Sequence, residues 1–242
     1  MLDAIEYALG QTCAPDEVIV VESKSELMIP PKSLPAKVRL ITSSSTLSPG
    51  ASRNRGAEAA SSEYLAFLDD DDLWDFQYLE FISSAILLAS SRGNRPNLLH
   101  GDLVDEQGTS RRNPKFSSER AFFFLNPGIT GSNLVVRREF FEGMGGFDVA
   151  IAPSEDRDFL ARTYLAGVPF IYVREARAVI RAVSGERISN RFLRSALAFI
   201  FKYWRVTKPS EKVLAFGMIG YKFASAVKRT LRARVSPLGT RN

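Results

Sequence analysis

Residues 63–74 have the sequence EYLAFLDDDDLW, in which a short apolar run ends in four consecutive aspartates at positions 69–72. A run of this length, rich in aromatic and aliphatic residues, is typical of a buried strand. Four adjacent carboxylates repel one another, so folding requires a cation or another positive field close to them. The stretch therefore predicts a strand that carries acidic side chains to the end of a sheet, where open α/β proteins bind ligands.

Segments on both sides of this stretch alternate between strand and helix patterns. Short β-branched runs at residues 17–21 and 38–42 predict two more strands, and residues 50–60 predict a helix with Ser48 or a nearby serine as its cap. Further strands are expected at 97–104, 132–136, 170–173 and 178–182, and further helices at 2–11, 79–89, 138–144 and 154–166. Strands that alternate with helices in this way predict an α/β fold built from βαβ units.

The rare residue types restrict the chemistry. Cys13 is the only cysteine and His100 the only histidine of the 242 residues, so an intrachain disulfide, a zinc cluster and a multi-histidine site are excluded. An enzyme of this composition would use carboxylates as acids and bases, together with a hard metal ion. The chain has neither a signal segment nor an apolar run of spanning length, which predicts a cytoplasmic protein, soluble or peripheral.

Charge is distributed unevenly along the chain. Residues 190–242 contain twelve bases and one acid, a balance of +11, which leaves −6 for residues 1–189 of the total +5. The bases alternate with aromatic and aliphatic residues, a composition that suits an amphipathic helical hairpin on an anionic bilayer. The alternative is a helical appendage that turns its charges to solvent. Nucleic acid is not expected as a partner, because nothing in the body resembles a nucleic-acid module.

The four aspartates are the first candidate site. Strand alternation would place Asp69 and Asp71 on one side, where they could share Mg²⁺ or Mn²⁺ with positions left open for phosphate oxygens. The alternative is a solvated acidic turn in which Asp72 caps the following helix.

The pattern around the aspartates resembles a known family. GASRNRG at 50–56, followed by EYLAFLDDDDLW, is similar to the "ARNxG … GEYIAFLDxDDxW" signature of family 2 glycosyltransferases with the GT-A fold. QT at 11–12, EVIVV at 17–21, and GGFD at 145–148 followed by EDRD at 155–158 also resemble that family's motifs, in the same order. The resemblance implies a Rossmann-like mixed sheet flanked by helices in residues 1–187, with a basic helical extension at 188–242.

It further implies an inverting transferase that moves a sugar from a nucleotide-diphosphate sugar to an acceptor hydroxyl. Asp69 and Asp71 would form the DxD pair, with Asp71 on the metal and Asp69 near the ribose or the metal shell; Asp70 would also lie on the donor side. Asp156 would be the base that accepts the acceptor's proton, with Glu155 as its neighbour or as a second candidate.

Three more residues lie at positions that the resemblance marks, although Glu22 stands where the family usually has aspartate. Arg53 and Asn54 would approach the diphosphate or the nucleotide, and Glu22 occupies a place where the family contacts the nucleoside. The family's chains begin with an apolar strand ending in PTYN, whereas Met1 lies at the predicted helix; we therefore expect the first strand to be absent and a sheet edge to be open.

The expected acceptor is a saccharide or a lipid-linked saccharide of surface polysaccharide or glycolipid synthesis, reached from the inner face of the cytoplasmic membrane. Two alternatives remain open. One is a truncated GT-A domain that is inactive and acts as a binding or partner subunit. The other is two-metal phosphoryl or nucleotidyl transfer, which lacks a Walker loop here and gives the EDRD segment no role.

Overall fold

A computed structural model gives the fold and describes residues 2–23, 34–111, 123, 128–181 and 190–235. The largest sheet has five strands in the order β3-β6-β5-β7-β4. These are β3 (Tyr64–Ala66), β4 (Leu73–Trp74), β5 (Leu98–Asp105), β6 (Leu134–Arg137) and β7 (Phe170–Ile180). β5 and β7 are parallel and the other neighbours are antiparallel. The predicted mixed sheet is thus confirmed.

A second, two-stranded sheet pairs β1 (Val18–Glu22) with β2 (Val38–Thr42) in parallel. Within the described residues, β1 is paired only with β2, and β3 only with β6. Each of these two strands therefore keeps one edge without a strand partner among the described residues.

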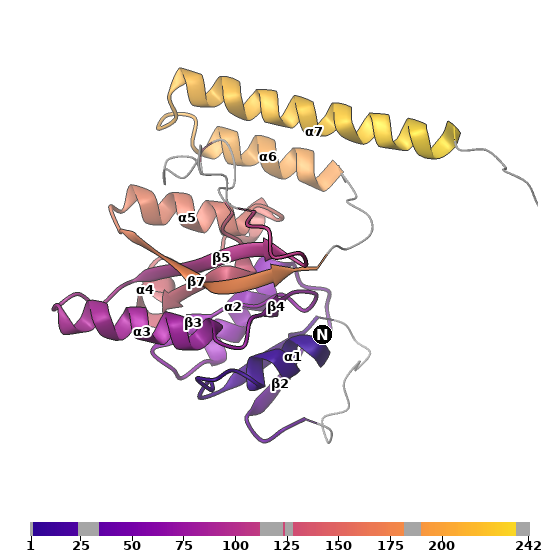
Figure 1. Cartoon of the computed structure of the whole chain (residues 1–242). Helices are drawn as coiled ribbons and strands as arrows, with labels where there is room; N and C mark the ends of the chain where they lie inside the picture. The colour runs from indigo at the N-terminus through magenta and orange to yellow at the C-terminus, as the bar shows by residue number, and fades with distance from the viewer. Residues whose placement is uncertain (1, 24–33, 112–122, 124–127, 182–189, 236–242) are drawn as a thin grey trace, which may run out of the picture.

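The described part of the chain has seven α-helices besides two short 3-10 helices (Figure 1). The α-helices are α1 (Leu2–Leu9), α2 (Pro49–Ala59), α3 (Tyr78–Ser91), α4 (Arg138–Gly143), α5 (Glu155–Leu165), α6 (Asn190–Lys202) and α7 (Pro209–Val235). Figure 1 shows α5, α6 and α7 stacked one above another on one side of the five-stranded sheet. Among the described residues, no helix is both long and apolar enough to cross a membrane.

The core lies on both faces of the five-stranded sheet. Leu98 faces a cluster formed with α2, α4 and α5, whereas its neighbour Leu99 faces a cluster formed with α3 and β7. Both leucines are completely buried, because successive side chains of a strand point to opposite faces and helices cover each face here.

Two expected elements differ from the structure. The strands predicted at 170–173 and 178–182 are one strand, β7, whose register against β5 shifts between Gly101 and Asp102. An irregularity of this kind interrupts the alternation of side chains without ending the strand.

Candidate active site

The four aspartates lie in the connection from β3 to β4. β3 ends at Ala66, and residues 69–72, here named the acidic turn, are closed by a hydrogen bond from the Asp72 amide to the Asp69 carbonyl oxygen (3.2 Å). Strand alternation therefore does not set their directions, contrary to the sequence argument. Asp72 does not cap a helix either, because β4 follows it directly and α3 begins only at Tyr78. Since β3 and β4 are the two outer strands, the chain must turn here to reach the opposite edge of the sheet.

The aspartates differ in their surroundings. Asp72 is buried and accepts hydrogen bonds from the Ser132 hydroxyl (2.5 Å) and the Arg181 amide (3.4 Å), which gives it a structural role. Partial burial, together with the carboxylates of Asp70 and Asp69, raises the pKa of Asp71. Negative charge is thus left undercompensated at Asp71, as expected for a cation ligand.

Arg53 connects the acidic turn to the start of α5. Ser48 caps α2 by accepting a hydrogen bond from the Ala51 amide (3.2 Å), as predicted, and the helix carries Arg53 inward. The Arg53 guanidinium forms an ion pair with Asp69, and its Nη1 lies 4.0 Å from Glu155 Oε1. Burial would lower the pKa of Arg53, but the surrounding carboxylates outweigh burial and raise it. Arg53 thus supplies positive charge to both carboxylate groups.

The space around this guanidinium is closely fitted. It lies against Gly131, where even a Cβ atom would collide with it, and 5.6 Å from the centre of the Phe147 ring. A larger residue at position 131 would displace Arg53 from the carboxylates.

Glu155 and Asp156 open α5 and have different environments. Glu155 is buried and its Oε1 accepts a hydrogen bond from the Gly50 amide (2.9 Å), which fastens the start of α5 to the start of α2. Asp156 keeps part of its surface exposed and accepts a hydrogen bond from the Arg157 amide (2.6 Å). Burial raises the pKa of Asp156 to about 6, against the lowering effect of Arg53. A carboxylate with a pKa near neutrality suits a general base.

The two remaining predicted site residues are placed elsewhere. The side-chain amide of Asn54 bonds to both the carbonyl oxygen and the amide of Phe147 (2.8 Å each), so it holds the turn after Gly146, whose φ is +65°. Glu22 is buried at the end of β1, in the two-stranded sheet. The structure thus joins Arg53, Asp69, Glu155 and Asp156, and gives Asn54 a structural task.

Arg181 is a contact of the acidic turn that the sequence did not indicate. Its Nε donates to the Asp71 carbonyl oxygen (2.9 Å) and its Nη1 to Asp3 (2.7 Å), so it ties α1 to the turn. More than a hundred residues separate Arg181 from the turn, and no local motif marks it.

The opposite side of α5 carries a second network that the sequence did not reveal. The Asp158 carboxylate is completely buried and is bound by Arg162 Nε (2.8 Å), Lys202 Nζ (2.8 Å) and the Tyr203 hydroxyl (2.7 Å). Lys202 and Tyr203 lie at the end of α6, so the first helix of the basic extension is joined to α5 by buried charge.

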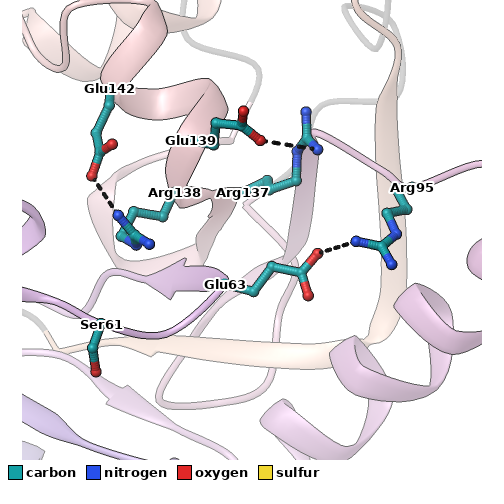
Figure 2. A pocket seen from close by; sticks show the side chains of 7 residues that line it. All are labelled: Ser61, Glu63, Arg95, Arg137, Arg138, Glu139 and Glu142. Carbon is teal, nitrogen blue, oxygen red and sulfur yellow. Dashed lines mark hydrogen bonds and ion pairs between the residues drawn. The ribbon is translucent and has the colours of Figure 1, made fainter.

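A surface hollow of about 380 Å³ lies at the other end of β3 (Figure 2). Its charged side chains form three ion pairs, Arg95–Glu63, Arg137–Glu139 and Arg138–Glu142. Its charges cancel, so it offers no net attraction to a diphosphate, and it does not include the acidic turn.

The carboxylates of the acidic turn would suit Mg²⁺ or Mn²⁺ if substrate phosphates and water supplied the other ligands. Among the described residues, no group of three or more His, Cys, Asp or Glu side chains is placed to hold a metal ion. Mg²⁺, however, is commonly held by one or two carboxylates together with substrate phosphates and water. Asp71 and Asp69 are the carboxylates of the acidic turn that the sequence indicates for such a pair.

Comparison with known proteins identifies the family and the fold. Residues 1–145 match the family described as Glycosyl transferase family 2. An uncharacterized glycosyltransferase of Haemophilus influenzae is 29% identical over 167 residues, 65% of this chain and 55% of that protein. One of Rickettsia felis is 27% identical over 172 residues, 65% of this chain and 28% of that protein. The chain thus spans about half of the first relative and about a quarter of the second.

Solved structures show the same fold. S. aureus TarS 1–349 in complex with UDP-GlcNAc superposes with a TM-score of 0.62 at 15% identity, covering 92% of this chain and 68% of that one. GalNAc-T7 with UDP, GalNAc and Mn²⁺ gives a TM-score of 0.58 at 16% identity, covering 83% and 45%. With the family match over more than half of its length, the chain belongs to glycosyl transferase family 2 and has the GT-A fold.

Proposed function

We propose that the protein is an inverting, metal-dependent glycosyltransferase that uses a nucleotide-diphosphate sugar. The observation that carries the proposal is the position of Arg53, which lies between the acidic turn and the start of α5 and interacts with Asp69 on one side and Glu155 on the other. It brings a candidate ion-binding pair and a carboxylate with a pKa of about 6 to one place. Crystal structures of two GT-A proteins, one with UDP-GlcNAc and one with UDP, support the donor class.

On the donor side, Asp71 and Asp69 would hold Mg²⁺ or Mn²⁺, and Asp70 would lie beside the nucleotide. A bound divalent ion would neutralise the charge that develops on the departing diphosphate. Arg53 holds Asp69 in place and adds a fixed positive charge, which favours a diphosphate in this otherwise acidic turn. Asp72, bound by Ser132, fixes the path of the backbone behind the pair.

On the acceptor side, Asp156 would take the proton from the attacking hydroxyl. The base must lie on the face of the sugar opposite the leaving diphosphate, and one displacement of this kind inverts the anomeric centre. Glu155 would support Asp156 by fastening the start of α5 to α2.

We also propose a saccharide or lipid-linked saccharide as acceptor, in surface polysaccharide or glycolipid synthesis at the inner face of the cytoplasmic membrane. The basic composition of residues 190–242 supports this choice. The alternative, a GT-A domain that binds a partner without catalysis, is favoured by one observation, the strand edges of β1 and β3 that have no strand partner in the described residues.

The test is release of nucleoside diphosphate from a panel of nucleotide sugars, with and without Mn²⁺. We expect one donor to be hydrolysed in the presence of the ion, and Asp71→Ala to abolish the reaction. Asp75→Ala is the matched control, because Asp75 is an exposed acid four residues further on. If Asp71→Ala and Asp75→Ala retain equal activity, the metal assignment is wrong; if no donor reacts with the wild type, the non-catalytic alternative is favoured.

A further inference from the structure

The outer side of α7 is apolar and exposed. The helix is buried along a narrow side through Glu211 and Ala215, whereas Val213 and Tyr221 are 71% and 74% exposed. Positions 213, 217, 220 and 224 repeat at helical spacing opposite the buried side, and Val, Gly, Gly and Ala occupy them. No charge interrupts this side between positions 213 and 221.

The corner between α6 and α7 continues the same apolar surface. Phe201 and Trp204 are 67% and 42% exposed, and the Trp204 ring lies 6.4 Å from that of Phe216 on α7. The Lys212 ammonium lies 4.1 Å from the centre of the Trp204 ring. We name the set of Phe201, Trp204, Val213, Phe216 and Tyr221 the outer patch.

Positive charge surrounds the outer patch. Arg205 and Lys208 are exposed at the corner, and the sequence of residues 222–241 adds six more bases and no acid. The single acid of residues 190–242, Glu211, is buried and accepts a hydrogen bond from the Lys208 amide (2.6 Å). A surface with exposed aromatic and aliphatic side chains and surrounding bases matches an anionic bilayer, where rings enter the headgroup region and bases meet phosphates.

We infer that the outer patch is the surface on which the protein docks to an anionic lipid bilayer, with α7 lying in the plane of the membrane. A second copy of the chain fits less well, because two patches facing each other would bring together two extensions of +11 each. The inference rests on the proposed function, because docking would serve to bring the candidate active site close to a lipid-linked acceptor.

Helix α6 packs against α5. Phe199 on α6 is completely buried and lies 3.9 Å from the Arg157 guanidinium, next to Asp156 in sequence. Docking through α7 would therefore hold the start of α5 at a set height above the membrane, because α6 lies between them (Figure 1).

The test is co-sedimentation of the full chain with vesicles of phosphatidylcholine alone or mixed with phosphatidylglycerol. We expect at least about tenfold stronger binding to the anionic vesicles, weakened by high salt. Equal binding to both kinds of vesicle, or binding to neither, would overturn the inference.

Two variants test the surface itself. Val213→Glu/Tyr221→Glu should reduce anionic binding by about tenfold or more, whereas Leu87→Glu, at a 69% exposed leucine on α3, should bind like the wild type. Equal binding of the double variant and the wild type would locate docking elsewhere. A wild-type dimer in sedimentation velocity that the double variant loses would identify a second copy as the occupant.

Donor hydrolysis without vesicles keeps the two proposals apart. All three proteins should release nucleoside diphosphate at equal rates and melt at similar temperatures, because the outer patch lies outside the catalytic residues. If the wild type hydrolyses no donor, the result counts against the proposed function alone. If the wild type binds no vesicles, the result counts against docking alone.

Discussion

Two carboxylates on α5, those of Asp156 and Asp158, lie two residues apart and have very different surroundings. Asp156 faces the acidic turn and Arg53, keeps part of its surface exposed, and has a pKa raised to about 6 by burial. Asp158 faces α6, is completely buried, and is bound by Arg162, Lys202 and Tyr203. The difference teaches that the packing around each acid, and not the acidic motif itself, decides whether its carboxylate is held by several positive partners or stays partly exposed.

The largest expected effect is on the catalytic side. Asp156→Asn removes the proposed base while keeping the shape of the side chain, so turnover should fall by about 10²–10⁴-fold. Stability should change little, because the carboxylate is unfavourably desolvated. Steady-state rates and a urea denaturation curve of the same preparation measure the two quantities, and a variant that retains wild-type turnover would remove Asp156 from its role.

The next effect is expected on the structural side. Asp158→Asn leaves Arg162 and Lys202 beside a neutral group in a buried place, so the free energy of unfolding should fall by about 3–5 kcal/mol. The folded fraction should retain the wild-type pH profile of turnover. Denaturant unfolding followed by fluorescence measures the loss; if stability is unchanged, the network contributes nothing to the joint between α5 and α6.

A smaller change sharpens the comparison. Tyr203→Phe deletes one hydrogen bond to the Asp158 carboxylate and leaves the ring packed against Phe199 and Phe123, so we expect a loss of about 1.5–3 kcal/mol. Tyr221→Phe on α7 is the matched control, because Tyr221 is 74% exposed. Equal melting temperatures for the two variants would contradict the contribution of this bond.

The smallest effect concerns pH. With a pKa of about 6, Asp156 is ionised above pH 6 and protonated below it, so turnover at saturating Mn²⁺ should be level near pH 7.5 and about tenfold lower at pH 5. Arg53 and Arg157 lower this pKa, while Glu155 and Asp69 raise it. Arg53→Gln should therefore move the midpoint upward; a midpoint that stays in place would show that Arg53 does not act on Asp156.

Much of the fold could be predicted from the sequence, because helices, strands and turns are largely set by residues that are close together in the chain. The strand at 38–42, the Ser48 cap and the break at Gly145 and Gly146 each follow from neighbouring residues, and the structure confirms them. The order of motifs was enough to indicate the family.

Contacts across long sequence distances could not be predicted in the same way. Two of the partners of Asp158, Lys202 and Tyr203, lie at the end of α6, more than forty residues away, and Arg181 reaches the acidic turn from the end of β7. The alternation argument for Asp69 and Asp71 failed because it assumed that the strand continues, whereas β3 ends at Ala66. Such positions depend on how the elements pack, which no single segment encodes.

The segment that contains the acidic turn must cross from one edge of the sheet to the other, so it needs a minimum number of residues. From Ala66 to Leu73 the chain has seven steps, a reach of roughly 24 Å at most. Four strand spacings require roughly 19 Å. The segment therefore has few residues to spare for the crossing, and an inserted residue would lengthen the path on which the aspartates lie.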